Sequence, residues 1–126
     1  MNSFWDYIEY FHPDEFDSPD EVGSGEKYMD ETLIRAMDYV RSKYGAPLRI
    51  NSGYRTEEHN RKVGGVPNST HRGGMACDVH IDSQEMGDKL EELFTDFLGE
   101  DVGIGKYNSF RHFDVRGHRA RWDNRT

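Results

Sequence analysis

The sequence is poor in apolar side chains and contains a single cysteine, Cys77. Hydrophobic residues make up 34% of its 126 residues, and the mean hydropathy is -0.95, so we expect a small core. One cysteine excludes an internal disulfide. Cys77 stands in an apolar stretch, which predicts a small buried side chain rather than a metal ligand or a nucleophile. No segment approaches the ~20 apolar residues of a membrane-spanning helix.

Basic residues are also scarce, with 16 Lys and Arg against 24 Asp and Glu and a formal net charge of -8. A general nucleic-acid-binding protein needs a basic surface to neutralise phosphates, so this class is excluded. The first residues, Met1 to Asp6, lack the basic start and the apolar run of a signal peptide. We expect a soluble protein made in the cytoplasm, with no membrane partner. No repeat or linker divides residues 1–126, which predicts one domain.

Hydrophobic periodicity predicts the main elements of the chain. Apolar residues at three- and four-residue spacing predict helices over 29–44 and 83–98, and a short helix is expected over 56–62 with Thr56 as its cap. Alternation predicts strands over 48–52, 76–81, 102–107 and 110–116, the last two joined as a hairpin by Asn108 and Ser109. Residues 4–11 are aromatic-rich and fit a short helix or a strand. Residues 14–26 are predicted to be an ordered loop, and the polar tail 117–126 to be anchored by Trp122.

One stretch combines a histidine and a carboxylate with small residues between them. His71 is followed by two glycines, which allow a tight turn, and then by a short predicted strand that carries Asp78. A later predicted strand offers His112 as a third ligand. Two imidazoles and one carboxylate, with a position left for water, form the ligand set of a catalytic zinc site. The sequence therefore predicts one zinc ion held by His71, Asp78 and His112.

Four further residues are candidates for contacts at this site. Asp114 lies two residues after His112, on the same strand face, and is either the general base of a hydrolysis or an acceptor that holds a ring nitrogen or Arg116. Arg55 follows a strand and is a candidate cation for a substrate carboxylate or a developing oxyanion. His80 shares a strand face with Asp78 and is expected to line the site without binding metal. Ser69, which begins the histidine stretch, is also predicted to contact substrate.

These residues resemble the zinc D-Ala-D-Ala peptidases, whose structural relatives include the lysostaphin and hedgehog zinc domains. The stretch from Ser69 to Asp78 matches the family motif Ser-x-His-x-x-Gly-x-Ala-x-Asp at every fixed position. Further matches are Ile50 to Arg55, His59-Asn60, Val63 to Gly65, the Phe-x-His-x-Asp-x-Arg run from Phe110 to Arg116, and Trp122. Residues 15–20 are similar to the corresponding segment of a small, often phage-encoded branch.

The resemblance implies a single compact α+β domain over residues 1–126, with a mainly antiparallel central sheet flanked by helices. It implies one zinc ion on His71, Asp78 and His112, and substrate or oxyanion contact by Arg55. It also implies cleavage of peptide bonds in peptidoglycan stem peptides or cross-links, by a D,D- or L,D-peptidase. Such a protein acts as an endolysin, a virion-associated factor or a bacterial remodelling enzyme, and we expect a monomer.

The chain departs from the family pattern at one position. Many members place a catalytic Glu or Asp three residues before the last zinc histidine, where this chain has Ser109. Asp114 is then the replacement base that we predict. A different class of function stays open, namely a zinc-stabilised module without catalysis that binds a peptide or a partner protein. A third interpretation makes the acidic chain a component of a larger assembly such as a phage tail.

Overall fold

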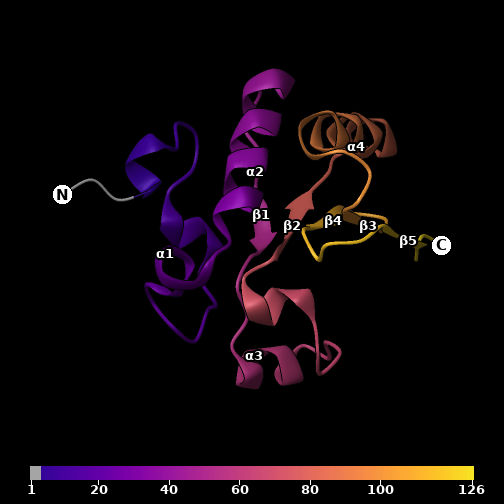
Figure 1. The fold of residues 1–126 in the computed structure, drawn as a ribbon. Helices are drawn as coiled ribbons and strands as arrows, with labels where there is room; N and C mark the ends of the chain where they lie inside the picture. The colour runs from indigo at the N-terminus through magenta and orange to yellow at the C-terminus, as the bar shows by residue number, and fades with distance from the viewer. Residues whose placement is uncertain (1–3) are drawn as a thin grey trace.

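The computed structural model describes residues 4–126, so the first three residues of the stretch considered as a signal peptide lie outside it. The fold is α+β, as expected (Figure 1). Five strands form one sheet in the order β1-β2-β4-β3-β5. They are β1 (Ile50–Ser52), β2 (Ala76–His80), β3 (Gly103–Lys106), β4 (Phe110–Asp114) and β5 (Ala120–Asp123). The pairs are antiparallel except β3 with β5, which is parallel.

Two long helices, α2 (Glu31–Tyr44) and α4 (Gln84–Leu98), pack against each other beside the sheet (Figure 1). Their apolar faces meet the side chains that strand alternation turns to one side of the sheet, including Cys77 and Phe113. Phe94 of α4 lies 4.7 Å from Phe113, measured between ring centroids. Cys77 is fully buried in this cluster, as expected. The core therefore occupies one face of the sheet and leaves the other face for a site.

The predicted helices begin at capping residues that satisfy free backbone N–H groups. Asp30 accepts from the backbone of Leu33 and starts α2, which ends at Gly45 with φ of 80°. Thr56 caps α3 (Glu57–Lys62), as predicted. Ser83 caps α4. The boundaries predicted from periodicity are thus confirmed to within one or two residues.

The amino-terminal segment takes the helical alternative predicted for residues 4–11 and is more helical than predicted over residues 14–26. Residues 4–11 contain a short 3-10 helix, η1 (Phe4–Tyr7), and the predicted loop 14–26 overlaps η2 (Pro13–Phe16) and α1 (Ser24–Tyr28). The Asp17 carboxylate accepts from the backbone N–H groups of Gly23 and Gly25, at 3.0 and 2.7 Å. Hydrophobic periodicity did not reveal α1, because the start of this helix depends on Asp17, which lies six and eight residues before the two glycines that it contacts.

A row of residues crosses the free face of the sheet. Asp78 pairs with Ser52 on one side and with His112 on the other. His112 pairs with Gly105, and Gly105 pairs with Trp122. Paired residues of neighbouring strands present their side chains to the same face. The row therefore gathers an acid, an imidazole and an indole from three strands.

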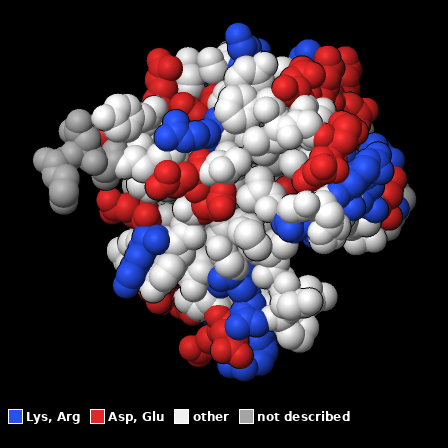
Figure 2. Space-filling model, in the orientation of Figure 1, with Lys and Arg blue, Asp and Glu red and all other residues white. Residues whose placement is uncertain are grey.

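On the side of the molecule shown in Figure 2, acidic and basic side chains are interspersed over the surface, and no continuous basic stripe crosses it. In the part of the chain that the structure describes, no helix combines the length and the apolar character that a membrane span requires.

Candidate metal centre

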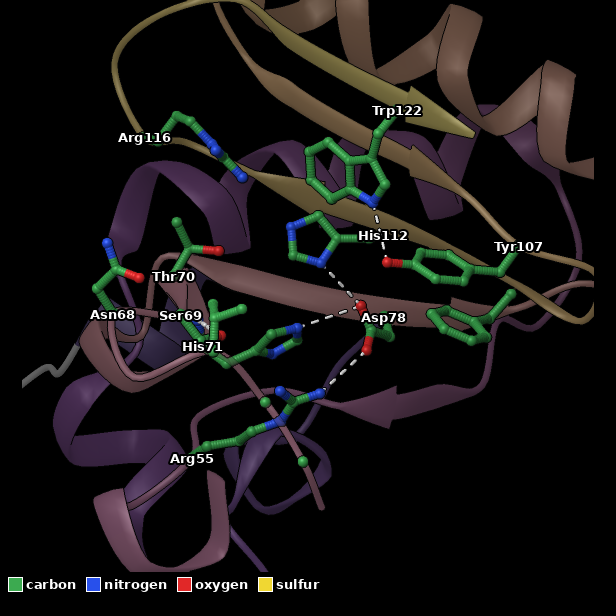
Figure 3. A pocket seen from close by; sticks show the side chains of 14 residues that line it. Arg55, Asn68, Ser69, Thr70, His71, Asp78, Tyr107, His112, Arg116 and Trp122 are labelled. Atoms are coloured by element: carbon green, nitrogen blue, oxygen red, sulfur yellow. Dashed lines mark hydrogen bonds and ion pairs between the residues drawn. The ribbon is translucent and has the colours of Figure 1, made fainter. Parts of the chain in front are cut away.

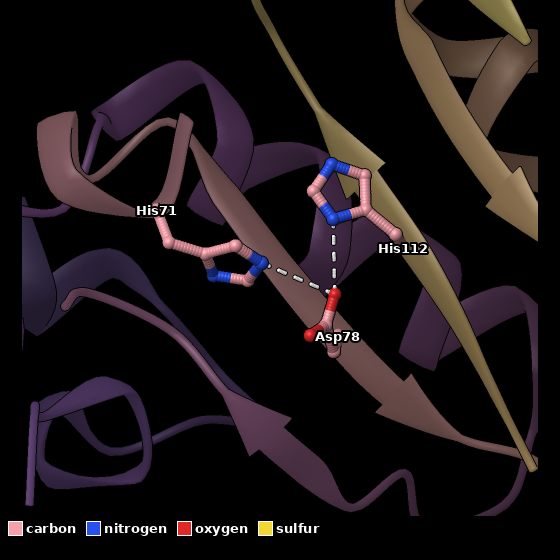
Figure 4. Close-up of side chains that lie close together, drawn as sticks. All are labelled: His71, Asp78 and His112. Atoms are coloured by element: carbon pink, nitrogen blue, oxygen red, sulfur yellow. Dashed lines mark hydrogen bonds and ion pairs between the residues drawn. The ribbon is translucent and has the colours of Figure 1, made fainter. Parts of the chain in front are cut away.

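The three predicted ligands converge on one point (Figure 4). His71 lies on the 3-10 turn η3 (Thr70–Gly73), Asp78 on β2 and His112 on β4. The Asp78 Oδ1 atom is 3.2 Å from His71 Nε2 and 3.0 Å from His112 Nδ1. One ligand atom from each residue lies within 4.8 Å of the other two. All three residues are buried, so the cluster is a defined site rather than a chance meeting of surface groups.

The His71 ring is oriented by the backbone. Its Nδ1 atom lies 2.8 Å from the carbonyl oxygen of Gly53, which accepts only, so Nδ1 carries the proton. Nε2, the atom that faces Asp78, then presents a lone pair. The turn that carries the ring is closed by Gly74 at φ of 72°, where a Cβ atom would meet the Tyr28 carbonyl oxygen at 2.0 Å. The predicted need for glycine at this turn is therefore confirmed.

The His112 ring is oriented by a carboxylate. Its Nε2 atom lies 2.7 Å from Asp114 Oδ2, on the side away from Asp78. Arg116 donates to the same carboxylate from Nε at 2.9 Å and from Nη2 at 2.6 Å. Asp114 is fully buried because Gly103 opposite it leaves room: a Cβ there would lie 2.3 Å from the carboxylate. Of the two roles predicted for Asp114, these contacts favour holding a ring nitrogen and Arg116.

The electrostatics of the cluster keep its carboxylates charged. Burial alone would raise the pKa of Asp78, but the hydrogen bond from His112 opposes it, and the pKa lies well below its usual range. Asp114 shows the same balance, with His112 and Arg116 as its donors. For His112, burial opposes the positive charge, but Asp114 and Asp78 raise its pKa above the ordinary value. At neutral pH both acids therefore act as acceptors only.

The donor set fits a zinc ion. Each histidine is fixed through its outer nitrogen, by a carbonyl or by a carboxylate, and turns its inner nitrogen to the common point. Such outer contacts are typical of metal-binding histidines, because they fix the tautomer and the ring direction. Two imidazoles and one carboxylate leave a fourth position for water, as in catalytic zinc sites.

The cluster forms part of the wall of a pocket of about 490 Å³. Arg55, which follows β1, points into it and donates from Nη2 to Asp78 Oδ2 at 3.5 Å (Figure 3). Its Nη1 donates to Asn60 at 3.2 Å, and Asn60 in turn donates to the Val66 carbonyl. The expectation that the strand before Arg55 neighbours that of Asp78 is confirmed by the pairing of β1 with β2. Burial lowers the pKa of Arg55, and the charge of Asp78 opposes this.

Sequence reasoning did not assign the opposite wall of the pocket. Arg116, Tyr107 and Trp122 line it (Figure 3), and Phe110, which stacks on Tyr107, also lines the pocket. Trp122 was expected to anchor a tail, but the tail forms β5, and a Cβ on Gly105 would meet the indole at 2.4 Å. The alternating glycines of β3 were the available signal, because they leave space for Asp114 and Trp122.

The remaining predicted residues have different positions. Ser69 lines the pocket, and its hydroxyl accepts from the His71 backbone N–H at 3.2 Å. His80 is not among the residues that line the pocket; its ring nitrogens face Arg49 at 3.1 Å and Asp82 at 2.9 Å. Ser109 is exposed and does not line the pocket either. The His80 ring therefore lies outside the pocket wall, although it was expected to line the site.

A buried His-Asp-His cluster in an open pocket of an α+β domain defines the protein as a candidate metallohydrolase. The family model described as Peptidase M15 matches residues 9–114, which is most of the chain. The chain therefore belongs to the peptidase M15 family, the zinc D-Ala-D-Ala peptidases that its motifs resemble. No curated protein sequence shows a significant match to it.

Proposed function

We propose that this protein is a zinc-dependent peptidase that hydrolyses peptide bonds in the stem peptides or cross-links of bacterial peptidoglycan. The observation that carries the proposal is the pair of histidines fixed from outside and converging, with Asp78, on the floor of an open pocket. His71, Asp78 and His112 would hold the zinc ion, which when bound would polarise a carbonyl group and lower the pKa of a water toward ~7.

The charge of the pocket supports an acidic peptide as the substrate. Arg55 and Arg116 lie on opposite sides of the cluster (Figure 3), and Asp78 is the single carboxylate among the described residues that line the pocket. Arg55 faces Asp78 and Arg116 is paired with Asp114, so the pocket is close to neutral, whereas the chain as a whole carries a net charge of -8. Stem peptides carry free carboxylates, which guanidinium groups bind through paired hydrogen bonds.

The chain's own residues have separate roles in this proposal. Arg55 binds a substrate carboxylate or the developing oxyanion and is held in place by Asn60. Asp114 orients His112 and neutralises Arg116. Ser69 holds the turn that carries His71 and borders the bound peptide. The protein acts as a monomer on the wall, either after release from the cell or within a virion, without nucleic acid or membrane as a partner.

A second function is favoured by one observation. Ser109, at the position where many family members have an acidic base, is exposed and does not line the pocket. A zinc-stabilised module that binds a wall peptide without cutting it accounts for this equally well. Mass spectrometry of treated peptidoglycan separates the peptidase from the binding module.

The test is mass spectrometry of purified peptidoglycan after incubation with the protein, with zinc and with a chelator in parallel. Zinc-dependent loss of a terminal D-Ala or of a cross-link establishes the peptidase and names the bond. His112→Ala should abolish cleavage, whereas His118→Ala, at an exposed position in the tail, should retain it. An unchanged wall from several bacterial types, incubated with protein shown to contain zinc, would refute the peptidase and leave the binding module.

A further inference from the structure

Besides its two arginines, the pocket has few acidic or hydroxyl groups that can act on a reacting oxygen. Asp78 is the single carboxylate among its described lining residues and belongs to the metal cluster. Asp114 is enclosed behind His112. The hydroxyl-bearing residues of the lining are Ser69, Thr70 and Tyr107. Tyr107 differs from the other two because it lies on the sheet side of the cluster, opposite Arg55 (Figure 3).

Tyr107 is held firmly in place. Its ring stacks on Phe110 with 4.2 Å between centroids and 11° between planes. Its backbone N–H donates to the Phe110 carbonyl at 3.2 Å, which closes the turn between β3 and β4. The Gln84 side chain donates to its carbonyl oxygen, also at 3.2 Å. A phenol held in this way presents its hydroxyl at a fixed point.

The direction of the Tyr107 proton follows from its neighbour. Trp122 Nε1 lies 2.9 Å from the Tyr107 hydroxyl oxygen, and an indole nitrogen only donates. The phenol oxygen must therefore accept from Trp122, and its own hydrogen points elsewhere. Figure 3 shows the oxygen turned toward the space in front of His112 and Asp78. A substrate carbonyl placed at the cluster lies in that direction.

We propose that Tyr107 is a catalytic residue that donates a hydrogen bond to the scissile carbonyl oxygen as negative charge develops on it, with Trp122 fixing the direction of the donor. The inference rests on the peptidase function proposed above. No proton leaves the phenol, so the balance of the hydrolysis is unchanged: water adds across the amide bond and yields a carboxylate and an amine. Together with Arg55, Tyr107 encloses the oxyanion from two sides.

The chemistry predicts a loss in turnover rather than in binding. Removing one preorganised donor to an oxyanion lowers kcat by ~10²–10³. Tyr107→Phe keeps the ring that stacks on Phe110 and deletes only the hydroxyl. It should therefore lower kcat by that factor, with KM, zinc content and Tm close to those of the wild type. Tyr44→Phe, which deletes a hydroxyl at the end of α2 and away from the pocket, is the matched control.

A binding measurement tests the same point without turnover. Calorimetry with a phosphinate analogue of the bond that the wild type cuts should show weaker binding to Tyr107→Phe by a similar factor, while the reaction product binds both proteins equally. Wild-type kcat, or unchanged phosphinate affinity, in Tyr107→Phe would overturn the role of Tyr107 and leave the peptidase intact. A wild-type protein that holds zinc and cuts no wall peptide would overturn both proposals.

Discussion

Replacing Asp114 by alanine distinguishes the two roles that its position allows. The Asp114 carboxylate is the acceptor for His112 Nε2 at 2.7 Å, and it is fully buried. Its loss leaves a buried ring N–H without a partner and frees the imidazole to turn. Loss of such outer contacts weakens metal binding by ~10–100-fold. This corresponds to about 1.4–2.8 kcal/mol of zinc-binding free energy, since each tenfold change is about 1.4 kcal/mol.

The chain contains a matched control for this variant. Asp123 and Arg125 repeat the arrangement of Asp114 and Arg116, with Nε donating at 2.9 Å and Nη2 at 2.6 Å. The Asp123 pair lies at an exposed end of β5 without a histidine. Asp123→Ala therefore removes an ion pair of the same geometry at a site without a histidine, and it should leave the zinc affinity unchanged. Zinc titration against a competing chelator, with circular dichroism as a check on folding, measures both variants.

Activity at saturating zinc completes the test. If Asp114 only orients His112, then Asp114→Ala regains most of its peptidase activity once zinc fills the site. If Asp114 is the general base, the variant stays inactive although its zinc content is complete. A folded Asp114→Ala with wild-type zinc affinity would refute the orienting role derived from the contacts of His112.

Three further predictions concern the frame around the site. Arg111→Met removes a fully buried guanidinium bonded to Glu91, Asp88 and Gln84 of α4. Because the Asp88 carboxylate is exposed and that of Glu91 partly so, the loss should cost about 1–3 kcal/mol in thermal unfolding, and the exposed Lys89→Met should cost less. Gly74→Ala should lower Tm more than Gly45→Ala, because both have positive φ but a Cβ at Gly74 also meets a carbonyl oxygen at 2.0 Å; equal losses would count against the packing argument. Zinc affinity should fall as the pH drops below the pKa of His112, because that pKa is raised in the metal-free protein and a proton then competes for Nδ1; a titration that stays flat through the histidine range would contradict this.

Local patterns in the sequence were sufficient to single out His71 and Asp78 as candidate metal ligands. The tight turn after His71 depends on glycines, and alternation fixes which face of β2 carries Asp78. The partner of Asp78 on β4 is His112, which the sequence alone indicates only as a residue on a later strand. The cap of α3 at Thr56 and the start of α4 at Ser83 are equally local and were predicted, whereas the cap of α2 at Asp30 was not.

The far wall of the pocket depends on contacts that no local pattern encodes. The polar tail was expected only to be anchored by Trp122, yet it forms β5, which gains its backbone partners from β3 in a parallel pair. Parallel pairing joins segments through a long connection and leaves no turn signal between them. Trp122, Arg116 and Tyr107 therefore meet only in the folded chain. For His80, strand alternation gave the same sheet face as Asp78, but the residue does not line the pocket.

The glycine at position 105 connects these contacts and can be tested directly. A Cβ at Gly105 would lie 2.4 Å from the indole of Trp122, so Gly105→Ala must push the indole away from the sheet. The push separates Trp122 from Tyr107, to which it donates at 2.9 Å, and from the ring of His112, 5.0 Å away between centroids. His112 keeps its contact with Asp114, so zinc should still bind.

Gly105→Ala is therefore expected to lower kcat while the zinc content stays complete. The indole N–H resonance of Trp122 should shift in the NMR spectrum as its hydrogen bond to Tyr107 is lost. The Tyr107→Phe variant serves as the reference, because it deletes the hydroxyl oxygen that accepts from the indole. If Gly105→Ala keeps both the wild-type resonance and the wild-type kcat, the space above Gly105 does not position Trp122, and the alternating glycines of β3 are then required only for Asp114 at Gly103.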